Sequence, residues 1–305
     1  MFQGKLIAAS MVFRHFPLRE AMKQVKAHGF DEMEVTVAGL FTPHFLHLHE
    51  MTENEMKEKA AEAGSCGIHI HALNIGAGFH PANTTIRSYH LQALRLAHAY
   101  NAEVVTLGCG GIQEGTDTIE GLKKIASYLN ELSLIAWNEY GIRLSVEAPH
   151  RCTVSEKLEQ IKTYWAYMPE RLLCTMDVAH ITFTGAPVEE VMQIVGNRLA
   201  HVHLRDAAPG NSMIPYGEGK VDFANVFRLL EKYNYQGKCS LEFPAGEKME
   251  DAIAAFEKGI QVLNEQREAS AHISSLPYSM HTLHQQETTP LDPLPVRCVP
   301  CHRKQ

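Results

Sequence analysis

The chain has 305 residues, of which 45% are hydrophobic and 21% are charged, and its formal net charge is −7. This composition is typical of globular proteins, and the negative balance weighs against a protein that wraps a nucleic-acid backbone. No apolar run is long enough to span a membrane, and the first residues lack the pattern of a secretory signal peptide. The seven scattered cysteines suit a reducing compartment. We therefore expect a cytoplasmic protein whose partners include neither nucleic acid nor membrane.

Short apolar segments, several of them rich in β-branched residues, recur along the chain and predict β-strands. The segments cover residues 6–10, 33–38, 68–74, 103–109, 143–149, 172–180, 199–207 and 239–245. Each is followed by a stretch with helical periodicity. In one of these stretches Thr52 and Glu55 have the spacing of a capping box. The predicted helices cover residues 17–30, 52–64, 84–101, 118–141, 154–168, 188–197, 221–235 and 247–266.

Strands that alternate with helices in this number predict a parallel sheet closed into a (β/α)8 TIM barrel, an α/β fold. An open, doubly wound sheet is the alternative, and it predicts a glycine-rich phosphate loop after an early strand. The first predicted strand instead runs into "MVFRHFPL". We therefore expect a single barrel domain over residues 1–265.

Residues 266–305 differ in character, with five prolines, little periodicity and many polar side chains. This composition predicts a disordered, flexible tail outside the packed domain. The tail ends in "CVPCH", which matches the C-x-x-C-H pattern of haem attachment. Attachment requires export, so we interpret the pattern as a chance match.

Ionisable side chains lie at the carboxyl ends of the last four predicted strands. They are Glu147 on the fifth, Asp177 and His180 on the sixth, His201, His203, Arg205 and Asp206 on the seventh, and Glu242 on the eighth. The carboxyl ends of barrel strands meet at one face, where the active sites of such barrels lie. A single strand-end carboxylate often caps a helix, but four strands in succession predict a shared metal or acid–base site.

Four of these residues, Glu147, Asp177, His203 and Glu242, offer three carboxylates and one imidazole. This donor set suits one divalent ion such as Mn²⁺, Mg²⁺, Co²⁺ or Zn²⁺.

An ordered set of motifs resembles the xylose isomerase-like superfamily of sugar isomerases and epimerases, and is similar to ketose 3-epimerases. The motifs are "EAP", "DVAH", "HVHLRD", "GEGKVDF" and "LEF", all within residues 143–245. The resemblance implies that Glu147, Asp177, His203 and Glu242 bind the metal and that Glu147 and Glu242 are also the catalytic acid–base pair. It implies further that His180 and Arg205 bind substrate oxygens, and that the chain forms dimers or tetramers.

The implied reaction moves a proton at the carbon next to a ketose carbonyl, in a small sugar or sugar phosphate. Such a step needs a base for the proton and a Lewis acid for the developing enediolate. Epimerisation also needs a second carboxylate on the opposite face of the substrate, a role that Glu147 and Glu242 could share.

Four further residues have weaker assignments. His71, near the end of the third predicted strand, is expected to bind substrate at the same mouth. Asp206 and Glu218 are expected not to bind the metal themselves but to contact the residues that bind metal or substrate. His201 is expected to be a buried structural histidine.

Three other functions are compatible with parts of this pattern. A dehydratase or lyase acting on a keto-polyol could use the same metal and base for enolisation and β-elimination. An endonuclease of the apurinic type needs extra histidines for a trinuclear zinc cluster, and "AAPGNSMIPYGEG" after the seventh strand contains none. A non-catalytic binding module would not need the complete ligand set.

Overall fold

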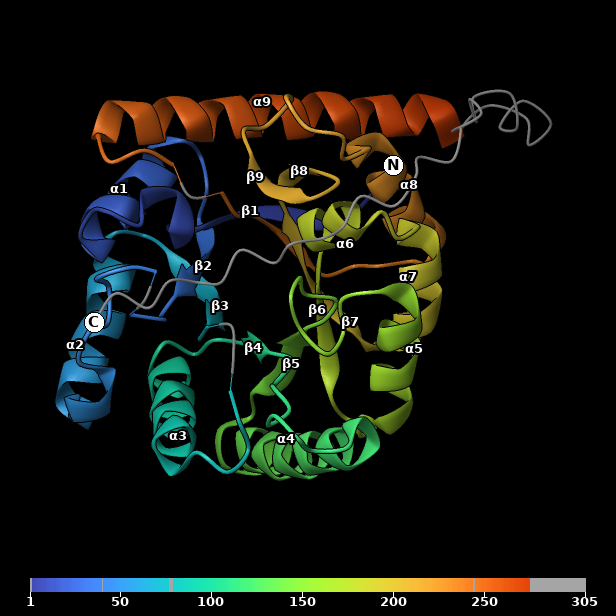
Figure 1. Cartoon of the computed structure of the whole chain (residues 1–305). Helices are drawn as coiled ribbons and strands as arrows, with labels where there is room; N and C mark the ends of the chain where they lie inside the picture. Colours follow the sequence, from blue (N-terminus) through green and yellow to red (C-terminus); the bar gives the residue numbers. More distant parts are fainter. Residues whose placement is uncertain (1, 40, 77–78, 244, 275–305) are drawn as a thin grey trace.

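The computed structural model describes residues 2–39, 41–76, 79–243 and 245–274. Eight parallel strands close into a barrel in the order β1-β10-β7-β6-β5-β4-β3-β2, and helices surround this ring of strands (Figure 1). The barrel strands are β1 (Lys5–Ala9), β2 (Glu32–Thr36), β3 (His69–Asn74), β4 (Val104–Gly108), β5 (Arg143–Glu147), β6 (Leu173–Asp177), β7 (Leu199–Leu204) and β10 (Lys238–Leu241). The predicted (β/α)8 barrel is confirmed.

The predicted helices are also present, and the Thr52–Glu55 capping box forms as expected. The α-helices are α1 (Leu18–Ala27), α2 (Glu53–Ser65), α3 (Thr84–Ala99), α4 (Thr118–Tyr140), α5 (Leu158–Tyr167), α6 (Val178–Thr184), α7 (Val188–Val195), α8 (Phe223–Lys232) and α9 (Met249–Ser274). Three short 3₁₀ helices are η1 (Ser10–Phe13), η2 (Leu48–Glu50) and η3 (Gly196–Arg198).

The interior of the barrel contains a polar layer. The hydroxyl oxygens of Thr106, Ser145 and Thr175 lie 2.7–3.0 Å from one another, although all three residues are buried. Because side chains alternate along a strand, the neighbours of these residues point outward and pack against the helices. The hydrophobic core therefore lies mainly between strands and helices, and the barrel interior is free to hold polar groups.

The sixth strand is shorter than predicted. β6 ends at Asp177, and α6 begins at Val178. The Asp177 carboxylate accepts hydrogen bonds from the backbone N–H groups of Ala179 and His180, at 2.7 and 3.3 Å. An aspartate that caps a helix in this way favours a helical turn directly after it. His180 therefore lies in the first turn of α6 and not on a strand.

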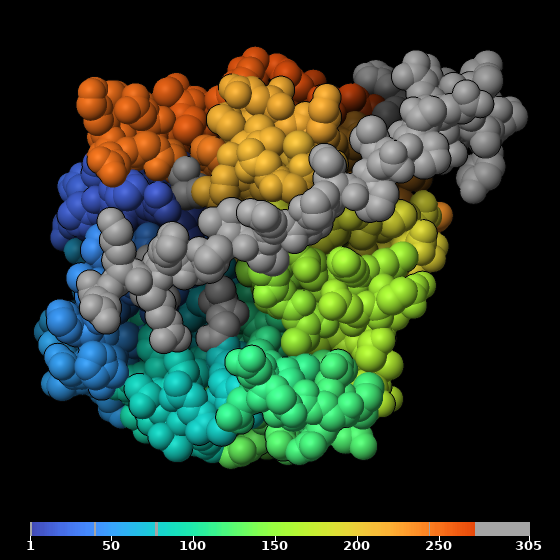
Figure 2. All heavy atoms as spheres, viewed as in Figure 1, coloured from blue at the N-terminus to red at the C-terminus, as the bar shows by residue number. Residues whose placement is uncertain are grey.

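The seventh strand ends at Leu204 and is followed by a small antiparallel hairpin that the sequence did not predict. Its strands are β8 (Asp206–Ala208) and β9 (Asn211–Ile214). In the space-filling view the hairpin (yellow-orange) forms a lobe beside α9 (Figure 2). The loop that follows the hairpin packs against α9, since Gly217 lies close to Val262.

The last helix continues beyond the predicted helix end at residue 266. α9 ends at Ser274, so nine residues of the segment expected to be a tail are helical. The rest of the tail, including "CVPCH", lies outside the described residues. In the part of the chain that the structure describes, no helix has both the length and the hydropathy needed to cross a membrane.

Candidate metal and acid–base site

The structure brings the four predicted ligands together. Glu147 and Asp177 end β5 and β6, His203 lies on β7, and Glu242 directly follows β10. One ligand atom from each lies within 4.8 Å of the others, and all four residues are buried. The Nδ1 of His203 is 3.1 Å from Glu147 Oε1 and 3.2 Å from Glu242 Oε2.

The donor set fits a divalent cation. Three carboxylates converge on this point, and His203 Nδ1 lies 3.2 Å from the buried Oε2 of Glu242. Carboxylates buried this close together repel one another unless a cation compensates their charge. Three oxygen donors and one imidazole suit a hard or borderline divalent ion, while the absence of a sulfur donor from the set argues against a soft one.

Arg205 and His180 lie against this ligand set. The Nη2 of Arg205 donates to Asp177 Oδ2 at 2.5 Å and lies 3.0 Å from His180 Nε2. Burial disfavours the charged form of Asp177, but the Arg205 guanidinium and the neighbouring histidines outweigh it and hold the pKa of this carboxyl below its usual range. The Asp177 carboxylate is therefore ionised and available as a ligand.

A cavity of about 210 Å³ opens onto the site. Glu147, Glu242, His180 and Arg205 line it, whereas the fully buried Asp177 and His203 lie beneath it. Asn74 lines the same cavity and donates to Glu242 Oε1 at 3.5 Å. Glu147 and Glu242, the expected acid–base pair, thus reach the space where a small substrate would bind.

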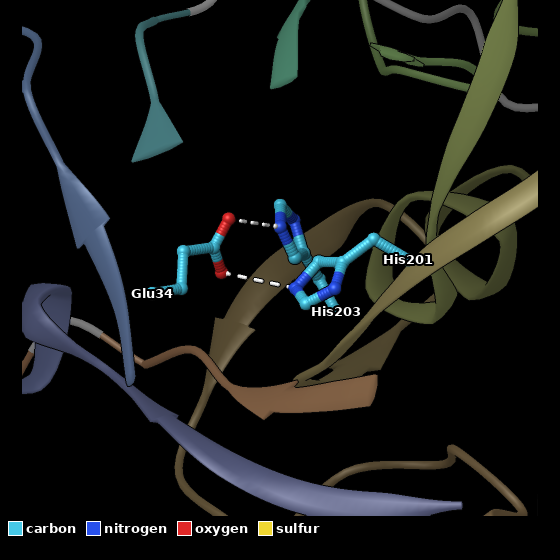
Figure 3. A group of neighbouring side chains, drawn as sticks. All are labelled: Glu34, His201 and His203. Atoms are coloured by element: carbon cyan, nitrogen blue, oxygen red, sulfur yellow. Dashed lines mark hydrogen bonds and ion pairs between the residues drawn. The ribbon is translucent and has the colours of Figure 1, made fainter. Parts of the chain in front are cut away.

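Glu34 on β2 belongs to the site, and the sequence reasoning missed it. Its carboxylate faces two imidazoles, with Oε1 3.1 Å from His203 Nε2 and Oε2 3.4 Å from His201 Nε2 (Figure 3). Ser240 also donates to Glu34 Oε2, at 2.6 Å. The available signal was a glutamate between the apolar residues of "MEVTV", on a strand predicted to be buried.

The charged forms of Glu34 and His203 stabilise each other. Burial disfavours ionisation of Glu34, but His203 and His201 lower the pKa of its carboxyl well below the usual value. Burial likewise disfavours the charged form of His203, yet Glu242 and Glu34 raise the pKa of its imidazole well above the usual value. His201 is fully buried and lies 3.1 Å from Ser240 Oγ, a position that suits the structural role expected for it.

The substrate contact expected of His71 stays a prediction, and the geometry gives it no support. His71 does not line the cavity, and its Nδ1 lies 3.3 Å from Oε1 of Glu103, a residue that directly precedes β4. It is the extra residue of a β-bulge in the β2–β3 pairing, between the partners of Met33 and Glu34. The imidazole is buried, 5.9 Å from the ring of His201, and its contact with Glu103 is at the amino end of β4.

The support expected from Asp206 and Glu218 likewise stays a prediction, and their contacts lie in the loop after β7. Asp206 is buried, but its carboxylate accepts from the backbone N–H groups of Ala207, Gly217, Gly219 and Val221, at 2.8–3.3 Å. These four bonds hold the loop after β7 in place, and none of them reaches a proposed ligand side chain. The side chain of Glu218 is exposed in that loop. Gly219 is required there, because a Cβ would lie 2.0 Å from Asp206 Oδ1.

A family model described as a xylose isomerase-like TIM barrel matches residues 22–266. An uncharacterized protein of Methanocaldococcus jannaschii is 26% identical over 282 residues, which span 86% of this chain and 91% of that protein. An inosose dehydratase of Clostridium perfringens is 29% identical over 143 residues, but these span only 40% of this chain and 47% of the dehydratase. The crystal structure of a D-tagatose 3-epimerase-like protein superposes with a TM-score of 0.68 at 22% identity. That match covers 89% of this chain and all of that one.

Proposed function

The chain belongs to the xylose isomerase-like TIM barrel family, and from this premise we propose that it is a divalent-metal-dependent sugar isomerase or epimerase. The proposed reaction moves a proton at the carbon next to the carbonyl of a small ketose. One observation carries the proposal: Glu147 and Glu242 line the same cavity and share one buried cluster with Asp177 and His203.

The metal would be held by Glu147, Asp177, His203 and Glu242, with the imidazole presenting Nδ1. When bound there, a divalent cation supplies Lewis-acid stabilisation for negative charge that develops on substrate oxygens. Mn²⁺, Mg²⁺, Co²⁺ and Zn²⁺ all suit the donor set, and the choice among them is left to metal analysis of the purified protein.

The proposed proton transfers use the two cavity-lining glutamates. They reach the cavity from β5 and from the end of β10, which are separated by β6 and β7 in the barrel. This separation allows one carboxylate to take a proton from one face of the substrate and the other to return a proton to the opposite face. Arg205 and His180 line the same cavity and would orient the substrate oxygens.

Deuterium exchange tests the proposal directly. The protein is loaded with Mn²⁺ and incubated in D₂O with free and phosphorylated ketoses, and deuterium next to the carbonyl is measured by NMR. The wild type should incorporate deuterium with at least one ketose, and Glu147→Gln and Glu242→Gln should lose this activity. Glu218→Gln, which makes the same charge change on an exposed loop residue, should retain it.

A dehydratase or lyase acting on a keto-polyol is the second candidate, because part of the chain is similar to an inosose dehydratase. Enolisation beside a carbonyl followed by loss of a β-hydroxyl would use the same glutamates and metal. Accumulation of an unsaturated or deoxy-keto product would favour this candidate. Metal binding with neither exchange nor elimination across the panel would contradict both, and three zinc ions per chain would favour a nuclease.

The remaining expectations stay predictions. A small-molecule sugar substrate follows from the proposed reaction, and dimers or tetramers follow from the family resemblance, which light scattering can check. The cytoplasmic location also stays a prediction.

A further inference from the structure

Three arginines line the cavity, and only one of them is neutralised. Arg205 pairs with Asp177 at 2.5 Å and lies 3.8 Å from Glu242. Arg14 and Arg151 also line the cavity, yet within the described part of the chain neither lies within 4.0 Å of a carboxylate. Among the described residues, two of the three cavity-lining guanidinium groups therefore have no carboxylate partner.

Arg151 is the less satisfied of these two arginines. It lies in the loop after β5, and its Nε is buried without a hydrogen-bond partner among the described residues. The Nε of Arg14, by contrast, donates to His15 Nε2 at 3.0 Å. A buried N–H of a guanidinium that lacks an acceptor is costly, and an acceptor supplied by a ligand would remove that cost.

Two histidine rings and a second guanidinium line the same cavity as Arg151. The rings of His150 and His180 lie 4.0 Å apart, and Arg205 contacts His180 at 3.0 Å. The only carboxylates in the cavity lining described by the structure are Glu147 and Glu242, which are assigned to the metal. An uncharged sugar could accept a hydrogen bond from Arg151 but would leave the charge of its guanidinium uncompensated.

We propose that Arg151 binds an oxyanion substituent of the substrate, a phosphate ester or a carboxylate, so that the substrate is an anionic keto-sugar. The inference rests on the proposed function, since it concerns the same cavity. A guanidinium presents a planar fork of N–H donors that matches the oxygens of both groups. Arg14 comes after β1, and β1 lies across the barrel from β5. Arg14 therefore reaches the cavity from the side opposite Arg151, and the proposal does not include it.

Equilibrium binding tests the subsite without requiring turnover. Calorimetry compares D-fructose, D-fructose 6-phosphate and 5-keto-D-gluconate as probes of the Mg²⁺-loaded full-length protein. The wild type should bind at least one of the two anions about 10-fold more tightly than fructose. The anion that shows the preference identifies the substituent as a phosphate or a carboxylate.

Variants of Arg151 and of a control arginine distinguish binding at this site from a general effect of the protein's net charge on anion affinity. Arg151→Gln should abolish the preference for the anion and leave fructose affinity unchanged. Arg151→Lys keeps the charge and should retain a weaker preference, so it keeps the test decisive if Arg151→Gln does not fold. Arg171→Gln is the matched control, because it removes the same charge from an exposed residue near the amino end of β6 and should behave as wild type.

Two results would overturn the inference. One is a wild type that binds fructose as tightly as both anions, and the other is an Arg151→Gln variant that weakens all three ligands equally. The proposed function fails separately: anion-selective binding without deuterium exchange contradicts the isomerase and leaves the subsite standing. Exchange with neutral ketoses only, without anion preference, contradicts the subsite and leaves the isomerase standing.

Discussion

The Nε2 of His203 lies 3.1 Å from Glu34 Oε1, while its Nδ1 faces Glu147 Oε1 at 3.1 Å and Glu242 Oε2 at 3.2 Å. One imidazole thus joins a carboxylate inside the barrel to the two carboxylates that line the cavity. A cation bound at the candidate position would replace the Nδ1 proton of this imidazole, while the Nε2 proton stays donated to Glu34. Glu34 therefore controls both the orientation of His203 and the nitrogen that is free to bind a cation.

Replacing Glu34 should weaken metal binding while leaving all four ligands in place. In Glu34→Gln the partner of His203 Nε2 loses its negative charge, and partners of this kind typically change metal affinity about 10- to 100-fold. Titration with Mn²⁺, followed by electron paramagnetic resonance, measures the change. Glu32→Gln is the control, because Glu32 begins the same strand and pairs with Lys5 and Lys238. Equal Mn²⁺ affinity in Glu34→Gln and wild type would contradict the assigned role.

Removing the charge of Asp177 should destabilise the metal-free protein. Asp177→Asn leaves the buried Arg205 guanidinium without its 2.5 Å partner, and breaking a buried pair in this way costs about 3–5 kcal/mol. Chemical unfolding in the presence of a chelator measures the free energy of unfolding. Glu120→Gln breaks an exposed pair with Lys124 and should cost less than about 1 kcal/mol. Similar losses of unfolding free energy in the two variants would show that the buried pair stabilises the protein no more than the exposed one.

Asp206 should matter for the stability of the loop after β7, and Glu218 should not. Asp206→Ala removes the acceptor of four backbone N–H groups and should lower the free energy of unfolding by about 2–4 kcal/mol. Glu218→Ala changes an exposed side chain of the same loop and should stay within about 0.5 kcal/mol of wild type. Thermal and urea unfolding compare the two, and a larger loss in Glu218→Ala would contradict this account.

Acidification should destabilise the fold in part through His90. Burial lowers the pKa of His90 to about 4, whereas an unfolded histidine titrates near pH 6.5. Between these values the unfolded state holds a proton that the folded state lacks, so the free energy of unfolding falls as the pH falls from about 6.5 to about 4. The contribution of this one residue reaches up to about 3 kcal/mol across the window.

Urea unfolding of His90→Gln at several pH values tests this linkage. The variant loses the 2.7 Å contact with the Tyr128 hydroxyl at every pH, but its stability should depend less steeply on pH than that of the wild type. His47→Gln replaces an exposed histidine and should keep the wild-type slope. Parallel curves for His90→Gln and wild type would show that His90 does not titrate as described.

The sequence by itself determined the barrel and the four residues proposed to bind the metal. Alternating strands and helices in this number leave few folds, and the carboxyl ends of parallel strands meet at one face of the barrel. Glu147, Asp177, His203 and Glu242 could therefore be placed together from their positions at the strand ends. Their convergence follows from the topology and requires no knowledge of side-chain packing.

Only the tertiary structure decided what lies behind and around those ligands. Alternation along a strand tells which side chains point inward, but not at which depth they lie or what they face. The bulge in the β2–β3 pairing interrupts this alternation at His71. The contact of Glu34 with His203 joins residues 169 positions apart in the chain. Such partners are set by the register and closure of the barrel, because strands distant in sequence meet only when the ring is complete.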